Sequence, residues 1–264
     1  MDNQSETCCG QLTDERVKNY RVSAFLSDIE SGVFSVRFHW GYHAHLHAQG
    51  HADLALGAFR AGLHASLGLA AKPVATRELA AMKVGFLRRA RRWLDANAVD
   101  SGRLDASPML EAAATVEATT WDLPEAGQLE SDRTVGFDLE EPLNPGLRDQ
   151  YLRCARSQDI VQLLEEIEDL YRDHLALADD PQGAYGTSLD LQVAVLRVMA
   201  TPSRSNEEDL ERKQIVLDEC ADFLEPTVLL RPMLEVTLLA DCRRVGATPE
   251  RIAELRALLP GDIA

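Results

Sequence analysis

The chain has 264 residues, of which 45% are hydrophobic and 27% are charged, a composition that is ordinary for a globular protein. Its 43 acidic and 27 basic side chains give a formal net charge of -16. Free nucleic acid and anionic membranes attract cationic surfaces, so both are excluded as expected partners, whereas a basic protein would be attracted. The five cysteines are odd in number and include no C-x-x-C pair, which is typical of a reducing compartment.

The N-terminal residues, 1–11, are polar and are expected to form a disordered tail. They lack the basic start and apolar core of a signal peptide, and no apolar run approaches the ~20 residues that cross a bilayer. We therefore expect a cytoplasmic protein. Arginine outnumbers lysine by 23 to 4, and with the high alanine content this usage is typical of a GC-rich bacterial genome.

Helix signals recur along the chain, whereas strand signals are few. Residues 33–38 (VFSVRF) and 134–139 (TVGFDL) alternate weakly, so at most one or two short strands are expected. The clearest helix starts at Asp159, which has Gln162 three residues later in the spacing of a capping box. The apolar stripe of this helix repeats with the helical period and comprises Ile160, Leu163, Leu164, Ile167, Leu170, Tyr171, His174 and Leu177.

The C-terminal part carries further helix boundaries. Ser205 begins an S-x-x-E sequence, the spacing of a second capping box. Gly246 stands where a left-handed residue would end the helix that begins near Pro232. Thr248 and Pro249 have the residue types of an N-cap and a first helical residue. About ten helices are expected in all, so the predicted fold class is all-α.

Gly50, Ala55, Phe59 and Gly62 mark one expected pair of helices. This pair resembles a tetratricopeptide-type hairpin, in which small residues let two helices approach and an aromatic ring fills the gap. The resemblance covers one hairpin, and no second copy follows at that family's spacing of about 34 residues. The chain is therefore predicted to form an irregular array of antiparallel helical hairpins, similar to a tetratricopeptide or α-solenoid array, with little or no strand.

The segment 121–146 divides the chain. It contains three prolines, three glycines and seven acidic residues, and it has no helical period. Connections longer than about 12–15 residues are uncommon in compact domains. We expect an acidic connector between an N-terminal helical half (12–120) and a C-terminal helical half (147–264), the two halves together forming one continuous domain.

Acidic side chains concentrate in the middle of the chain. From Asp105 to Gly183 there are 19 acidic and 5 basic residues. Complementary charge of this kind speeds encounter with a basic protein and excludes wrong partners. The predicted function is therefore to bind and mask a basic protein partner, as an immunity protein or an antitoxin does. The expected contact residues are Asp138, Glu140 and Glu141 in the connector, and Glu165, Glu166, Asp169 and Asp173 on the helix.

Five of the seven histidines lie between positions 39 and 51. On a helix, His39, His43, His47 and His51 are each four residues apart, and adjacent members could share one divalent transition metal. A metal-binding protein or metalloenzyme built on these four histidines is therefore the alternative prediction. The competing interpretation is that His43 and His47 line a contact between helices, each neutral and hydrogen-bonded.

No catalytic motif stands out, since G-x-S-x-G, the P-loop and the dinucleotide fingerprint are absent. Cys154 has Arg153 and Arg156 beside it, which could lower the pKa of its thiol, but one cysteine without a base is more often structural. Arg60 and His64 lie one turn apart and indicate no definite chemistry. We expect a protein that is not an enzyme and that carries no cofactor.

Overall fold

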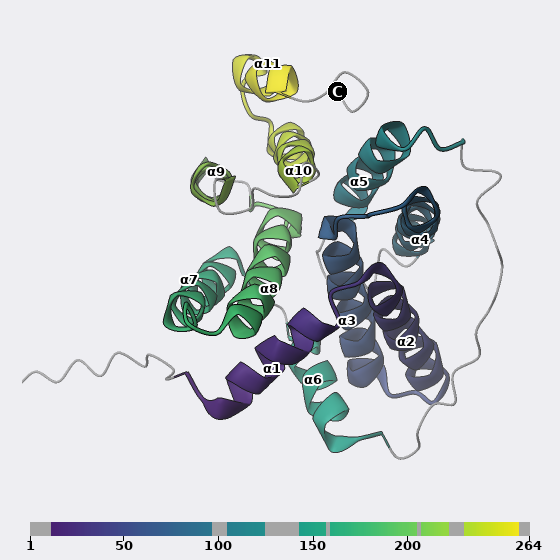
Figure 1. Ribbon diagram of the computed structural model, residues 1–264. Helices are drawn as coiled ribbons and strands as arrows, with labels where there is room; N and C mark the ends of the chain where they lie inside the picture. Colours follow the sequence, from purple (N-terminus) through teal and green to yellow (C-terminus); the bar gives the residue numbers. More distant parts are fainter. Residues whose placement is uncertain are drawn as a thin grey trace, which may run out of the picture.

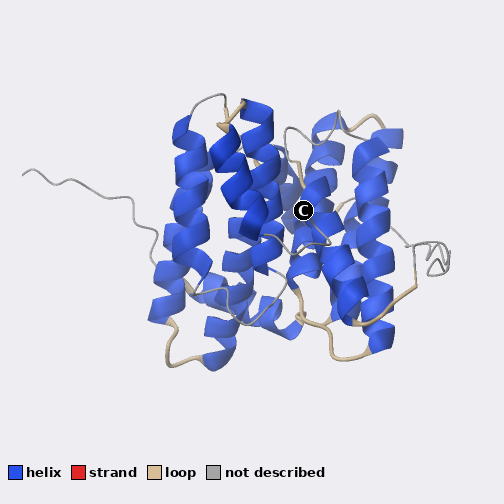
Figure 2. Ribbon diagram, turned by 90° about the horizontal axis from the view of Figure 1, so that it is seen from above, coloured by secondary structure: helices blue, strands red, loops and turns tan. Residues whose placement is uncertain are grey.

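The computed structural model describes residues 12–96, 105–124, 143–156, 159–204, 207–221 and 230–258. Over these ranges the chain forms eleven α-helices and no strand (Figure 2). The prediction of an all-α array of about ten helices is confirmed. The expected N-terminal tail, most of the acidic connector and the possible strand at 134–139 lie outside the described residues.

Figure 1 labels the helices in chain order. Their bounds are α1 (Asp14–Phe25), α2 (Ile29–Ala48), α3 (Ala52–Ala71), α4 (Arg77–Ala96), α5 (Ser107–Thr120), α6 (Pro145–Ala155), α7 (Ile160–Ala176), α8 (Pro181–Ala200), α9 (Glu207–Ala221), α10 (Leu230–Val245) and α11 (Pro249–Leu258).

The possible strand at 33–38 is wrong, because these residues lie within α2. Val33 and Val36 are both buried in the largest apolar cluster of the molecule. Their spacing of three places them on the same face of a helix, and in a strand they would face opposite sides. The apolar residues of this segment therefore belong to the buried face of a helix and not to one face of a strand.

The predicted helix boundaries agree with the structure wherever it describes them. Asp159 and Gln162 form the reciprocal hydrogen bonds of a capping box at the start of α7. The hydroxyl of Thr248 accepts a hydrogen bond from the backbone of Arg251 at 3.3 Å, at the start of α11. Gly246 ends α10 with a φ of 76°. Ser205 lies outside the described ranges.

Helices α2 and α3 form the hairpin that was expected around Gly50. Gly50 has a φ of 79°, which suits the residue that joins the two helices. A Cβ atom at Gly62 would overlap the indole of Trp40, so only glycine lets the two helices approach this closely. The ring of Phe59 is fully buried and stacks on Trp93 with ring centroids 4.7 Å apart.

Helices α3 and α8 lie at the centre of the array (Figure 1). Helix α3 contacts α2, α4, α5 and α6, helix α8 contacts α1, α7, α9 and α10, and the two central helices pack on each other. The largest apolar cluster extends from Ile29 in α2 to Leu255 in α11. A single core therefore runs through both halves of the chain.

The two halves repeat the same order of helices, with α1 to α5 corresponding to α6 to α10. Tyr20 in α1 and Tyr151 in α6 are both buried. Asp28 and Asp159 cap the next helix in each half, and each accepts a backbone hydrogen bond from the third residue of that helix. The central helices α3 and α8 have the same length of 20 residues. The chain thus contains an internal repeat of half its length, far longer than the tetratricopeptide period.

Side-chain contacts are repeated along with the helices. His43 donates from Nδ1 to the carbonyl of Ala55 at 2.9 Å, and His174 lies with Nδ1 3.0 Å from the carbonyl of Ala184. Each histidine thereby joins the helix before a central helix to the first turn of that central helix. This common geometry shows that the two halves are built on one plan.

Two glycines let the halves cross. A Cβ atom at Gly57 in α3 would overlap the main-chain carbonyl of Tyr151 in α6. At the same position within α8, a Cβ atom at Gly186 would overlap the main-chain carbonyl of Tyr20 in α1. Each half therefore sends its first helix across the central helix of the other half, and both crossings depend on backbone-to-backbone contact.

Helix α3 is long and apolar enough, by length and composition, to cross a membrane, with a mean hydropathy of 1.3 over its most apolar window. This helix was not recognised as such a candidate in the sequence. However, 72% of that window is buried by the surrounding helices, as is usual for the core helix of a helical array.

The close crossing of α3 and α6 predicts that replacing Gly57 with alanine destabilises the protein, although alanine usually stabilises a helix relative to glycine. Alanine normally stabilises a helix interior by about 1 kcal/mol relative to glycine. We expect Gly57→Ala to lower the free energy of unfolding by about 2 kcal/mol instead, because its methyl group meets the backbone of Tyr151. Gly68→Ala, on the same helix, is the matched control, since its methyl group meets only a side-chain atom of Val193 at 3.3 Å. Urea unfolding measures both, and a Gly57→Ala variant as stable as Gly68→Ala would contradict the close crossing.

Candidate functional site

A cleft of about 880 Å³ opens between the two halves. It is lined by α3, by α6 and α7, by Arg16 of α1 and by the segment that runs from the end of α8 into α9; we call the part from Arg197 to Arg204 its floor. Clefts of this size are typical of ligand sites in proteins. Charged side chains make up most of its lining, and they are unevenly distributed over its walls.

One wall is cationic. Arg60 and His64 lie one turn apart on α3, and Arg153 and Arg156 lie at the C-terminal end of α6. Helical spacing of three and four residues places each pair on one face, which here is the face toward the cleft. We call Arg60, His64, Arg153 and Arg156 the arginine wall. The sequence showed the one-turn spacing of Arg60 and His64, but not that α6 would cross beside them.

The opposite wall is acidic. Glu165, Glu166 and Asp169 line the cleft from α7, and Asp159 stands at the N-terminus of that helix. The carboxylate of Glu166 forms an ion pair with Arg197 of α8, with an N–O distance of 2.6 Å. This pair ties α7 to the floor of the cleft, because the side chain of Arg197 is largely buried.

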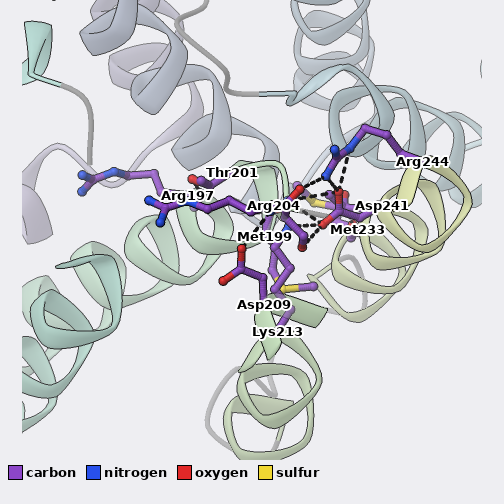
Figure 3. A network of polar contacts seen from close by, with 11 residues as sticks. Arg197, Met199, Thr201, Arg204, Asp209, Lys213, Met233, Asp241 and Arg244 are labelled. Atoms are coloured by element: carbon purple, nitrogen blue, oxygen red, sulfur yellow. Dashed lines mark hydrogen bonds and ion pairs between the residues drawn. The ribbon is translucent and has the colours of Figure 1, made fainter. Parts of the chain in front are cut away.

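A buried polar network fixes the segment that follows α8 at the floor of the cleft (Figure 3). The carboxylate of Asp241, on α10, accepts hydrogen bonds from the backbone nitrogen of Ser203 at 3.0 and 3.2 Å and from its hydroxyl. Lys213 of α9 donates to the same carboxylate at 2.7 Å and to the carbonyl of Met199 at 3.0 Å. Arg244 donates to Asp241 and to the carbonyl of Ser203.

The network continues into the cleft lining. The carboxylate of Asp209 accepts a hydrogen bond of 2.8 Å from the backbone of Arg204, so the segment is held on its other side as well. Both residues line the cleft. The position of the cleft floor is therefore set by polar contacts from α9 and α10 rather than by the loop itself.

Charged neighbours change the acidity of Asp241. Burial alone would raise the pKa of its carboxyl group, but Lys213, Ser203 and Arg244 outweigh burial and hold that pKa below its ordinary value. The side chain of Lys213 is fully buried and that of Asp241 is 5% exposed. Removing one member of such a pair leaves the other charge buried without a partner.

Cys154 also lines the cleft, where burial raises the pKa of its thiol despite the nearby charges of Arg197, Arg153 and Arg60. The expectation that neighbouring arginines could lower this pKa is therefore wrong, because desolvation of the thiolate outweighs their attraction. A thiol of this kind is not activated as a nucleophile.

Six of the seven predicted acidic contact residues fall into three groups. Glu165 is exposed on α7, and Asp169 pairs at the surface with Arg172 at 2.8 Å. Glu166 is committed to Arg197. Asp138, Glu140 and Glu141 lie outside the described residues.

Asp173, the seventh predicted contact residue, is buried rather than exposed to a partner. Its side chain is 5% exposed, accepts a hydrogen bond of 2.5 Å from the hydroxyl of Tyr20 and pairs with Arg16. Helix α1 covers this part of α7, a contact between residues far apart in the chain. Burial and the neighbouring carboxylate together raise the pKa of Tyr20 to about 12.

Three of the four predicted histidines, His39, His43 and His47, lie on α2, and the two buried ones have different hydrogen-bond partners. Nδ1 of His39 lies 3.1 Å from the hydroxyl of Tyr151, and burial lowers the pKa of His39 to about 4. His43 bonds to the carbonyl of Ala55 and packs against Phe59 and Trp93, with ring centroids 5.3 Å away in both cases.

The other two predicted histidines are exposed. The ring of His47 lies 6.0 Å from that of His43, and His51 stands at the start of α3 without a side-chain cap bond. In the described part of the chain, no group of three or more histidine, cysteine, aspartate or glutamate side chains is arranged to hold a metal ion. The four predicted ligands therefore do not converge, and the two buried ones pack between helices.

No family model, curated protein or solved structure matches the chain.

The packing of α2 predicts different roles for two neighbouring histidines. We expect His43→Ala to lower the free energy of unfolding by about 2 kcal/mol, because it removes a buried hydrogen bond and leaves a void beside Phe59 and Trp93. The matched control His47→Ala, at an exposed position, should change stability by less than about 0.5 kcal/mol. Thermal unfolding of the chelator-treated protein measures both, and equal effects of the two changes would contradict the packing role.

The Asp241 network predicts a pH dependence of stability. Because Asp241 holds its proton more weakly in the folded chain, its stabilising effect is complete above the ordinary aspartate pKa of about 4. That effect is lost as the pH falls through the lower folded value. We expect Asp241→Asn to lower the free energy of unfolding by about 3 kcal/mol at pH 7 and to flatten its dependence on pH below about 5.

Chemical denaturation between about pH 7 and pH 3 measures this slope. Asp95→Asn, which removes a carboxylate that is 56% exposed, is the control and should cost less than about 1 kcal/mol. An Asp241→Asn variant with the pH slope of the parent chain would show that the network does not hold the carboxylate ionised.

Proposed function

We propose that this chain is a binding protein that captures a basic segment of a protein partner on the acidic face of α7. The observation that carries the proposal is the row formed by Glu165, Glu168 and Asp169, which we call the acidic ridge. Spacing of three and four residues places these carboxylates on one face of the helix. The ridge borders the cleft, since Glu165 and Asp169 belong to its lining.

The carboxylates of the ridge are available to a partner. Glu165 and Glu168 are exposed, and neither has an ion-pair partner within the ranges that the structure describes. Asp169 pairs with Arg172, one turn away at the surface, a contact of small energetic value. A lysine or arginine of a partner could therefore bind here without first breaking a strong internal contact.

The repeat supports a special role for the ridge. Counted from the helix caps Asp28 and Asp159, the ridge positions correspond in α2 to Phe34, Arg37 and Phe38. The same helical position in the first half thus carries aromatic and basic side chains. The fold does not require carboxylates on this face, which makes a functional reason for them the better explanation.

Charge over a wider area favours the same partner. Residues 159–221 contain 15 acidic and 5 basic side chains, although the whole chain has 43 and 27. A surface of this sign attracts cationic proteins over about one Debye length, roughly 8–10 Å in physiological salt. Masking a basic partner in the manner of an immunity protein or an antitoxin, in a bacterial cytoplasm, is the function class that we propose.

Peptide binding tests the proposal directly. A lysine- and arginine-rich peptide should bind the full chain, and a glutamate-rich peptide of equal length should not, as measured by fluorescence anisotropy. The affinity should fall at least about tenfold when salt rises from ~50 to ~500 mM, because the contact is ionic. Glu165→Gln/Glu168→Gln/Asp169→Asn should weaken binding by a further factor of about ten at low salt.

The control variant removes three carboxylates elsewhere. Glu30→Gln/Asp53→Asn/Glu250→Gln takes the same charge from exposed sites on α2, α3 and α11. This variant should bind the basic peptide within about twofold of the parent chain. Equal weakening in both variants would show that net charge alone attracts the peptide and would overturn the assignment to the ridge.

A further inference from the structure

We propose that the arginine wall is a binding site for an oxyanion, namely the phosphate or carboxylate group of a small ligand that enters the cleft. This site goes beyond the capture of a basic partner, because it uses the opposite wall and the opposite charge. Four observations carry it: a buried guanidinium with no counterion among the described residues, a histidine beside it, two rim arginines with no ion pair in the same ranges, and the absence of these groups from the corresponding place in the repeat.

The guanidinium of Arg60 is buried and has no acidic partner in the described part of the chain. The residue is 7% exposed, and the hydrogen bonds of its side chain go to the carbonyls of Cys154, at 3.3 Å, and Ala155, at 2.6 Å. Its Nε has no hydrogen-bond partner among the described residues. A buried charge without a counterion is costly, and an oxyanion in the cleft would supply the missing charge.

His64 lies deep in the cleft beside this charge, with part of its surface open to the cavity. Burial first, and then the charges of Arg197 and Arg60, hold the pKa of His64 well below its ordinary value. Its imidazole is therefore neutral near pH 7 and can donate one hydrogen bond to an anion. The carboxylate nearest to Arg197, that of Glu166, is already committed to it.

Arg153 and Arg156 extend the positive charge to the rim. Both side chains are exposed, and neither has an ion-pair partner in the part of the chain that the structure describes. Planar guanidinium groups bind phosphate and carboxylate with two parallel hydrogen bonds, which suits this wall to oxyanions rather than to other acceptors.

The central helices show that the fold does not require these groups. Helices α3 and α8 have equal length, so Arg60 corresponds to Leu189 and His64 corresponds to Val193. The second half therefore places two apolar side chains at the positions where the first half has a buried cation and an imidazole.

The first helix of each half, α1 and α6, shows the same difference between apolar and charged residues. Counted from the caps Thr13 and Asn144, Arg153 corresponds to Val22 and Arg156 to Phe25. All four members of the arginine wall are thus replaced by apolar residues in the other half. Charge has been placed on one side of a repeated fold, as expected for a site added to a scaffold.

A structural role for Arg60 does not account for the wall. Its bonds to Cys154 and Ala155 satisfy carbonyls at the C-terminal end of α6, where a cation is favourable. Capping α6 accounts for the hydrogen bonds that Nη1 of Arg60 makes, and for no other group of the arginine wall. It leaves the Nε of Arg60, the imidazole of His64 and the two rim arginines without a hydrogen bond or ion pair to any residue that the structure describes.

The test titrates the full chain with inorganic phosphate at constant ionic strength, while NMR follows the histidine side chains. The signal of His64 is identified by its absence in His64→Gln. We expect this signal to move in a saturable way, with a dissociation constant of about 1 mM or tighter. Arg153→Gln/Arg156→Gln should weaken binding at least about tenfold, since both changes are at exposed positions and leave the core intact.

Arg243→Gln/Arg256→Gln removes two exposed arginines from α10 and α11 and is the matched control, expected to bind phosphate within about twofold of the parent. Acetate, titrated in the same way, distinguishes a phosphorylated ligand from a carboxylate ligand. The ridge variant Glu165→Gln/Glu168→Gln/Asp169→Asn should keep its phosphate affinity, which separates this site from the proposed capture of a basic partner.

Two results would overturn the proposal. One is the absence of any saturable shift of His64 with either phosphate or acetate. The other is equal weakening of phosphate binding in the rim variant and in the control variant, which would reduce the effect to net charge.

Discussion

A buried lysine holds the C-terminal end of each central helix, and the packing of both halves around α3 and α8 depends on these two contacts. Lys83 and Lys213 are fully buried, and each donates to a carbonyl at the end of α3 or α8. Each also pairs at 2.7 Å with a carboxylate from a later helix, Glu117 in α5 and Asp241 in α10. Such pairs are costly to break singly, so the ends of α3 and α8 are fixed relative to the helices around them.

The repeat separates what the scaffold needs from what the cleft adds. Both halves keep a buried tyrosine on the first helix, an aspartate cap on the second and a glycine where the helices cross. The charged groups of the cleft do not follow this plan. Arg60 and His64 stand where the other half has leucine and valine, and the acidic ridge stands where it has aromatic and basic residues.

The cleft therefore carries acidic side chains on α7 and basic side chains on α3 and at the end of α6. In the proposed function, the acidic ridge on α7 attracts a cationic partner. The arginine wall would hold an anion through different side chains. The pair between Glu166 and Arg197 neutralises both charges locally. Two ligands of opposite charge could thus be bound without competing for the same side chains, and each would reduce the field that repels the other.

The sequence by itself determined the features that depend on neighbours within one or two helical turns. The cap at Asp159, the turn at Gly50 and the all-helical class follow from local hydrogen bonds and from the helical period. Only the tertiary structure decided that α1 would bury Asp173 and that the end of α6 would bond to Arg60 through the carbonyls of Cys154 and Ala155. These pairings join residues from different halves of the chain, and no local pattern records them, because they arise from which helices cross and how closely their backbones can approach.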